Sequence, residues 1–272
     1  WTAQAGVLRN IAYIDEPFVG QYHLAPDRVE WNGTVDLPSG AGAVYAGSVK
    51  ISADAQAGGY TFFFDGAEVS LHVADRVLPP PQEWKYIMNM WHNPWAMARL
   101  SGTKPWSDEH FEAMKPFMAF TAAWGQKGIV ASISDFPWDH QCYDGYRTMI
   151  RHIQNPVKKE WTFDYTIFDK WVEFNFATGN GKFIECYSLC PWGYAVYWED
   201  TTGRPVRICP KPGTPEFEEY WTPFLRDFVK HLREKGWLEK VRMSFDERDA
   251  GDVKKIAEYL ARFAPEFRVS AA

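Results

Sequence analysis

Two neighbouring carboxylates, Asp246 and Glu247, come at the end of a segment that predicts a β-strand over residues 240–246. A carboxylic acid that donates a proton near neutral pH needs a raised pKa, and a second carboxylate close by raises it through like-charge repulsion. Consecutive Cα atoms are only about 3.8 Å apart, so the two side chains can interact in this way. The pair therefore has the composition of a general acid–base centre.

A structural role for the same acids is also open. Asp246, Glu247, Asp249 and Asp252 precede a predicted helix, and acidic side chains at a helix N-terminus are stabilised by the helix macrodipole. We expect Asp252 to cap this helix, whose apolar stripe would be Val253, Ile256, Ala257 and Leu260. Neighbouring residues on a regular strand point to opposite faces, so both carboxylates reach one pocket only if the strand ends at Asp246 and Glu247 turns away.

Aromatic, amide, imidazole and carboxylate side chains follow the other predicted strands. Sugar rings have apolar faces that stack on indole rings and hydroxyl groups that bond to acids and amides, so this combination favours a glycan site. The 14 Trp residues and the aromatic content of 17% agree with it. The candidate substrate-binding residues are Trp91, His92, Asn93, Asp135, Trp138, His140, Tyr187, Trp192, Tyr197 and Trp198. Taken singly, each fits a packing or strand-ending role about as well.

The elements that must position these residues alternate between strands and amphipathic helices, which specifies an α/β fold with a parallel sheet. Polar residues after each strand favour a (β/α)8 TIM barrel. Because only about five of the eight units are present, we interpret residues 83–272 as a TIM-barrel catalytic domain whose C-terminal strands are missing. An open α/β sheet is the alternative. The strands are expected over 86–90, 128–134, 182–189, 240–246 and 267–272.

Helix signals are clear at two places. Ser107 is a predicted N-cap, and a second helix is expected to begin at Thr214 and Pro215 and to end at Gly236. Pro223 is expected to bend or interrupt that second helix.

The first part of the chain has a different pattern. Alternating residues over 43–55 and a hairpin signal at Asp65-Gly66 predict antiparallel strands. We therefore expect residues 1–82 to form a β-sandwich domain, complete or partial. The prolines of the segment LPPPQEW (78–84) indicate a stiff linker to the next domain.

Composition excludes several classes of protein. The net charge is −6 and the chain contains no basic run, which argues against nucleic acid as a partner. No segment of 18 apolar residues is present, so we expect no membrane span. The sequence contains no phosphate-binding loop, no HExxH motif and no zinc-ligand spacing among its four cysteines, so we expect no cofactor and no metal. The first ten residues lack the pattern of a signal peptide, and oligomeric state is left open.

A longer segment carries a family resemblance. The segment HLREKGWLEKVRMSFDERD (231–249), with a helix that ends in Gly-Trp and a strand that closes on Asp-Glu, resembles glycoside hydrolase family 123 and the related DUF4091 group. The segment VLPPP (77–81) followed by Trp-His-Asn-Pro (91–94) is similar to their junction between sandwich and barrel. The likeness covers most of the chain. It departs from the family at Arg248, where relatives often have proline, and in the missing last strands.

The resemblance implies an exo-acting β-N-acetylhexosaminidase, of the β-N-acetylgalactosaminidase kind, acting on glycans with a terminal N-acetylhexosamine. It also favours a secreted or periplasmic location. The implied mechanism is retaining and substrate-assisted: Asp246 orients the 2-acetamido group, Glu247 is the general acid and base, and Tyr187 or Tyr197 adds a hydroxyl group. This mechanism suits an adjacent pair, because two carboxylates that flank a sugar usually come from different strands, about 5 Å apart.

Two other functions are consistent with the same residues. The first is a non-catalytic glycan-binding protein on the same scaffold. The second is a glycosidase whose nucleophile is an enzymic carboxylate, which would not need an acetamido group on its substrate.

Overall fold

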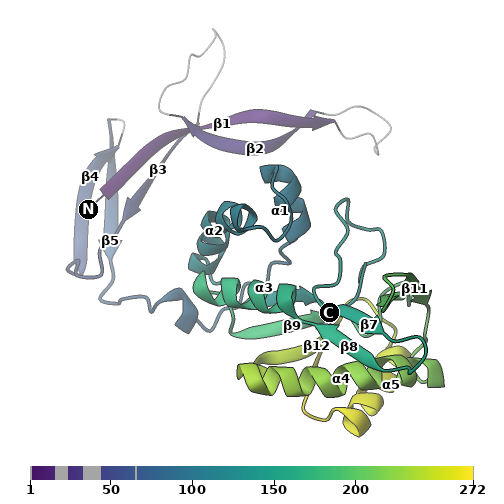
Figure 1. The fold of residues 1–272 in the computed structure, drawn as a ribbon. Coiled ribbons are helices and arrows are strands. Elements are labelled where there is room, and N and C mark those ends of the chain that lie inside the picture. Colours follow the sequence, from purple (N-terminus) through teal and green to yellow (C-terminus); the bar gives the residue numbers. More distant parts are fainter. Residues whose placement is uncertain (1, 16–23, 33–43, 65, 272) are drawn as a thin grey trace. The chain divides into compact units, whose positions relative to one another are not determined.

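The computed structural model describes residues 2–15, 24–32, 44–64 and 66–271 (Figure 1). The chain divides into two units, Trp1–Leu78 and Pro79–Ala272, and each is described by itself. The division falls four residues before the expected boundary at 82/83. That these units are a sandwich domain and a catalytic domain stays a prediction.

The N-terminal unit is built from antiparallel strands. Its three-stranded sheet has the order β2-β1-β3, and a separate hairpin joins β4 to β5. The bounds are β1 Thr2–Asp15, β2 Leu24–Asn32, β3 Val44–Lys50, β4 Gly58–Phe64 and β5 Ala67–Val73. The expected hairpin is confirmed: Gly66 has a φ of +79°, a conformation that glycine adopts without steric cost, while Asp65 lies outside the described residues. The sandwich itself stays a prediction.

The C-terminal unit has a mixed α/β fold around a parallel sheet with the order β13-β12-β9-β6. Its strands are β6 Gly128–Ser132, β9 Phe183–Tyr187, β12 Val241–Phe245 and β13 Arg268–Ala271. Four of the five expected strands are thus confirmed with tighter bounds. All residues of β6 and β9 are buried, as expected for parallel strands covered on both faces. Each neighbouring pair in this sheet is parallel, so the carboxyl ends of these strands share one edge.

The expected strand over residues 86–90 is wrong. Only one parallel bridge forms there, between Met88 and Gln126. The carbonyl groups of Trp84 and Tyr86 accept hydrogen bonds from the Lys127 ammonium instead of from a neighbouring strand. The segment is rich in apolar residues, but the ladder of hydrogen bonds that defines a strand does not extend beyond this bridge.

The described part of this unit contains five α-helices. Their bounds are α1 Pro94–Ser101, α2 Asp108–Ala123, α3 Thr166–Ala177, α4 Pro215–Lys235 and α5 Ala250–Phe263, with short 3₁₀ turns at Pro81–Glu83 and Leu238–Lys240. The Ser107 and Thr214 hydroxyls accept hydrogen bonds from the backbone N–H groups three residues later, and Gly236 ends α4 at a φ of +71°. These predicted ends are confirmed. The expected interruption is not, because α4 runs unbroken through Pro223.

The predicted cap of α5 is also wrong. Asp249 is the N-cap, and its Oδ1 accepts the Asp252 N–H at 3.0 Å. The Asp252 carboxylate turns instead to Arg248 and to the hydroxyl of Tyr194. The apolar stripe shifts accordingly, since Tyr259 is buried where Ala257 was expected.

A second sheet of four short strands was not predicted. Its order is β11-β10-β7-β8, with a parallel pair at its centre and an antiparallel hairpin on each side. The strands are β7 Arg151–Gln154, β8 Trp161–Asp164, β10 Val196–Asp200 and β11 Pro205–Ile208. One hairpin lies in the connection from β6 to α3, the other in that from β9 to α4. The mixed sheet is therefore made from connections that leave the carboxyl edge of the parallel sheet.

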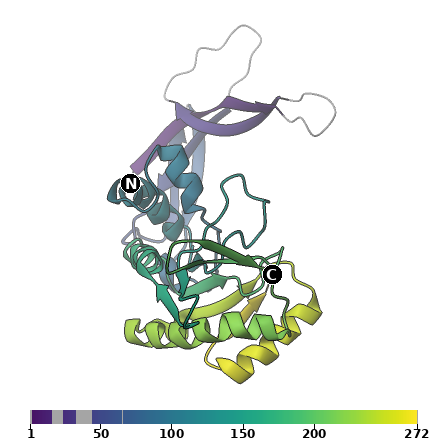
Figure 2. The same ribbon diagram turned by 45° about the vertical axis from the view of Figure 1, so that its right-hand side comes forward.

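Helix α4 supplies much of the hydrophobic core and runs along the parallel sheet with α5 beside it (Figures 1 and 2). The largest fully buried side chains include Trp171, Trp221, Phe168, Phe217, Phe224, Phe228 and Phe245. Some of the many tryptophans therefore serve packing. All four cysteines are free thiols. Among the described helices, none combines the length and the apolar character that crossing a bilayer requires.

Candidate active site

The acidic pair lies directly beyond the last residue of β12. Asp246 is half-buried and Glu247 is exposed. Glu247 has a φ of +46°, in the left-handed region that residues other than glycine seldom occupy. This turn ends the strict strand alternation at the pair, which was the condition for both carboxylates to face the same side.

The Asp246 carboxyl has a raised pKa. Burial is the larger cause and the charge of Glu247 the second, while the nearby indole N–H of Trp138 acts in the opposite direction. The Trp138 indole N–H does not form a hydrogen bond of normal geometry with the Asp246 carboxylate. Its Nε1 is buried and has no partner in the described part of the chain. The pKa raised by the neighbouring charge is therefore that of Asp246, the carboxylate to which the resemblance gives the orienting role.

An aromatic cluster borders Asp246. The ring centroids of Trp91, Trp138 and Tyr187 lie 4.9–5.2 Å from one another, and Tyr146 packs on Trp138 at 4.6 Å. Burial, followed by the charges of Glu185 and Asp246, raises the pKa of Tyr187, so its hydroxyl stays protonated. Trp138 and Tyr187 are buried, whereas Trp91 is 38% exposed. Trp91 is therefore the member of the cluster best placed to stack on a ligand.

The loop after β9 is tied to the acidic pair. The Trp192 indole N–H donates to the Asp246 carbonyl at 2.9 Å, and the Trp192 backbone N–H donates to the Pro137 carbonyl at 3.0 Å. Arg248 Nη1 donates to the Trp192 carbonyl at 3.0 Å. These bonds fix the three loops after β6, β9 and β12 to one another around Asp246.

Arg248 is held in turn by a buried ion pair. Its Nη2 lies 3.1 Å from Asp252 Oδ2, and the two side chains are 9% and 10% exposed. The Tyr194 hydroxyl donates to the same oxygen at 2.7 Å, and its ring lies 4.4 Å beneath the guanidinium. This network was missed, although its signal was present: Arg248 directly follows the acidic pair.

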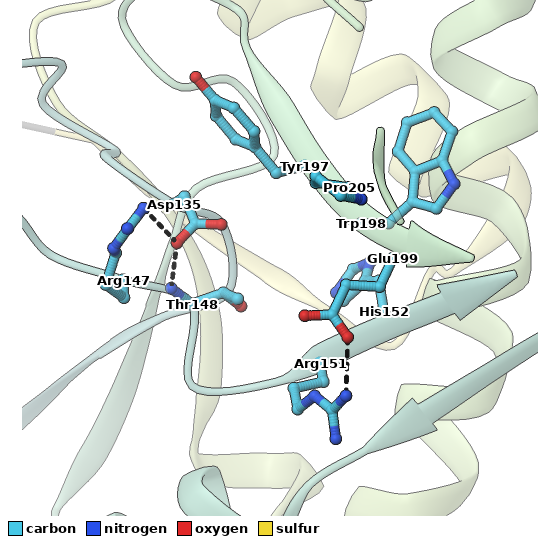
Figure 3. Close-up of a pocket in the computed structure, with 9 residues that line it drawn as sticks. All are labelled: Asp135, Arg147, Thr148, Arg151, His152, Tyr197, Trp198, Glu199 and Pro205. Carbon is cyan, nitrogen blue, oxygen red and sulfur yellow. Dashed lines mark hydrogen bonds and ion pairs between the residues drawn. The ribbon is translucent and has the colours of Figure 1, made fainter. Parts of the chain in front are cut away.

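Three other predicted residues line a separate pocket of about 330 Å³ at the mixed sheet (Figure 3). Asp135 comes from the loop after β6, and Tyr197 and Trp198 from β10. The Thr148 N–H donates to Asp135 Oδ1 at 3.1 Å, Arg147 lies 3.7 Å from the same oxygen, and burial raises the pKa of this carboxyl. The pocket residues that were missed are Arg147, Thr148, Arg151, His152, Glu199 and Pro205.

The remaining predicted residues have surroundings of other kinds. Asn93 is the N-cap of α1: its Oδ1 accepts two backbone N–H groups, and its Nδ2 donates to the Asp144 carbonyl at 2.7 Å. His92 is buried and its Nε2 has no partner among the described residues. The His140 side chain is 83% exposed. Contact of these three with a substrate stays a prediction. Within the described ranges, no three His, Cys, Asp or Glu side chains gather in a way that could hold a metal ion.

Acid is expected to destabilise the fold through His92. Burial lowers the pKa of this imidazole from 6.5 to about 4, so the folded state binds the proton less tightly than the unfolded chain does. The resulting stability is fully present above pH 6.5 and is lost as the pH falls through about 4. His92→Phe should therefore reduce the drop in the free energy of unfolding between pH 7 and pH 4.5, by roughly 2 kcal/mol.

Urea unfolding at the two pH values measures this effect. The control is His140→Phe, because the His140 side chain is exposed to solvent. An unchanged pH dependence in the His92 variant would contradict the assignment.

Comparison with protein families decides what kind of chain this is. The model of the glycoside hydrolase 123 catalytic domain matches residues 91–272. The chain belongs to glycoside hydrolase family 123. The match includes the acidic pair, the aromatic cluster and the pocket of Figure 3, and it confirms the resemblance seen at residues 231–249.

A solved structure has a similar fold. It belongs to a family 123 glycoside hydrolase from Clostridium perfringens, described in connection with glycolipid glycan hydrolysis. It has 25% sequence identity and a TM-score of 0.81, and the similarity covers 99% of this chain and 51% of that one. The present chain thus spans about half the length of that relative. No protein with a curated description matches it.

Proposed function

We propose that the protein is a retaining, exo-acting β-N-acetylhexosaminidase that removes terminal N-acetylgalactosamine from glycans. The family membership supports a glycosidase, and the glycolipid glycan described for the Clostridium perfringens relative supports the substrate class. The observation that carries the proposal is the adjacent pair Asp246 and Glu247, one carboxylate half-buried beside Tyr187 and the other exposed. The difference in burial suits different roles: the half-buried Asp246 orients the substrate, and the exposed Glu247 exchanges a proton with the leaving group and water.

In the proposed reaction the substrate supplies its own nucleophile. The oxygen of the 2-acetamido group attacks the anomeric carbon, the glycosidic bond breaks, and Glu247 donates its proton to the leaving oxygen. Asp246 accepts a hydrogen bond from the acetamido N–H and balances the positive charge of the oxazolinium ring. Glu247 then takes a proton from water, which attacks the anomeric carbon and reopens the ring with overall retention.

The surroundings of the two acids support this division. Asp246 is fixed by the Trp192 loop and lies among aromatic side chains, as an orienting carboxylate should. Glu247 is exposed, so it can reach a leaving group and exchange protons with water. Of the two tyrosines considered, we favour Tyr187 for the acetamido group, because the Tyr197 hydroxyl accepts a hydrogen bond from Arg207 and Tyr197 lines the other pocket.

We also infer the scaffold. Strands that neighbour one another in chain order, with helices in their connections, are typical of a (β/α)8 barrel, whose active sites lie at the carboxyl ends of the strands. We propose that residues 83–272 are part of such a barrel and that residues 1–82 form a β-sandwich.

Hydrolysis assays test the proposed function. The protein is expected to release nitrophenol from nitrophenyl N-acetyl-β-galactosaminide, to be inhibited by a thiazoline analogue of the oxazolinium ring, and to leave the matched β-galactoside uncleaved. Equal cleavage of the β-galactoside would mean that an enzymic carboxylate is the nucleophile. Calorimetric binding of the sugar without turnover would instead identify a glycan-binding protein.

A further inference from the structure

The pocket of Figure 3 is unused by the proposed chemistry. It lies between the loop after β6 and the strands β7 and β10, at the mixed sheet. We propose that it binds a neutral sugar unit of the same glycan, on the leaving-group side of the scissile bond. This inference rests on the proposed function and extends it from the terminal sugar to the next one.

The pocket and the aromatic cluster share one loop. Residues 135–148 supply Asp135, Arg147 and Thr148 to the pocket, and Trp138 and Tyr146 to the cluster beside Asp246. Asp135 and Trp138 are three positions apart in the chain, so their Cα atoms lie at most about 11 Å apart. The same loop thus lines the pocket and borders the acidic pair, as expected if neighbouring units of one glycan bind at the two places.

The charges of the pocket favour a neutral ligand. Arg147 faces Asp135 at 3.7 Å, and Arg151 pairs with Glu199 at 2.7 Å and with Asp164 at 3.9 Å. Each arginine is thus already paired with a carboxylate. Little uncompensated positive charge remains in the pocket to attract an anionic ligand. Carboxylate oxygens retain lone pairs that accept hydrogen bonds from sugar hydroxyls.

A buried histidine adds a group that suits a hydroxyl. His152 lines the pocket and is 3% exposed, its Nδ1 lies 2.9 Å from the Tyr220 hydroxyl, and its Nε2 has no partner among the described residues. Burial lowers the pKa of this imidazole to about 3, so it is neutral. A hydroxyl both donates and accepts, so it is chemically complementary to a neutral imidazole in either tautomer. Tyr197, Trp198 and Pro205 add apolar surface for the face of a sugar ring.

The test compares two substrates. One is nitrophenyl N-acetyl-β-galactosaminide, and the other is a disaccharide of the same sugar β-linked to galactose. Glu199→Gln removes one carboxylate and its pair with Arg151, so the ratio of kcat/KM for the disaccharide to that for the nitrophenyl glycoside is expected to fall about tenfold.

The matched control is Glu266→Gln. Glu266 forms a similar pair with Arg233 at 2.6 Å, and Arg233 and Arg151 are 58% and 57% exposed. This variant should keep the wild-type ratio. An equal ratio in both variants would overturn the proposal, as would a preference of the wild type for a uronic acid in place of galactose.

A binding measurement separates failure of this inference from failure of the proposed function. If the wild type cleaves neither substrate, the proposed function is wrong, and the same disaccharide is then titrated calorimetrically into the three proteins. Binding about tenfold weaker in Glu199→Gln than in Glu266→Gln supports the pocket. Equal binding, or no binding to the wild type, excludes it.

Discussion

Glu247→Gln is expected to lower kcat/KM for an unactivated glycan by about 10²–10⁴-fold, the usual contribution of a general acid or base. The amide cannot donate a proton to the leaving oxygen or remove one from water. Nitrophenolate leaves without a proton, so the loss should be smaller for the nitrophenyl glycoside. Initial rates on both substrates measure this difference, which is specific to loss of the acid.

Asp246→Asn should also cost several orders of magnitude in rate, but by about the same factor for both substrates, because the acetamido group must be oriented in each. Asp249→Asn is the matched control. It changes a carboxylate three residues away, and asparagine still caps α5, so turnover should stay near that of the wild type. If the Asp246 and Glu247 variants both keep wild-type rates, the assignment of the pair is wrong.

Arg248→Gln is expected to lower the free energy of unfolding by roughly 3–5 kcal/mol, the usual cost of removing one partner of a buried ion pair. Asp252 would keep the Tyr194 bond but lose the guanidinium that neutralises it in a site only 10% exposed. The variant would also release the Trp192 carbonyl, and with it the loop that holds Asp246. Chemical denaturation measures the first effect and kcat the second.

Two further variants separate burial from charge. Arg233→Gln removes the arginine of the exposed pair with Glu266, and it should change stability by less than about 1 kcal/mol. The double change Arg248→Met and Asp252→Leu removes both charges, and should recover much of the lost stability. If Arg248→Gln and Arg233→Gln lose the same free energy of unfolding, burial adds nothing to the contribution of the Arg248 ion pair.

Much of the parallel part of the fold follows from local sequence. The period of Phe217, Trp221, Phe224 and Phe228 predicts α4, and the caps at Ser107 and Thr214 fix helix starts, because these signals act within a few residues. The mixed sheet could not be predicted in this way. Its strands have four or five residues, and their pairing joins connections far apart in the chain.

The candidate site also has parts that local sequence predicts and parts that it does not. The adjacent acids are visible in the sequence because adjacency is itself the signal. Three of the aromatic residues expected to bind glycan, Trp91, Trp138 and Tyr187, do come together. Asp135, Tyr197 and Trp198 instead line the pocket at the mixed sheet, since the strands that place them there were not foreseen. The cap at Asp249 rather than Asp252 has a partly tertiary cause, because the distant Tyr194 hydroxyl binds the Asp252 carboxylate together with Arg248.

The pairing of β7 with β10 has a consequence for how such enzymes diverge. Glu199 lies opposite Ile153 and Asp200 opposite Gln154, so the β6–α3 and β9–α4 connections are hydrogen-bonded into one sheet. A slip of one residue between β7 and β10 would turn Glu199 to the other face of the sheet, away from Arg151. Relatives with other substrates should therefore differ in both of these connections together, and the parallel strands should differ less.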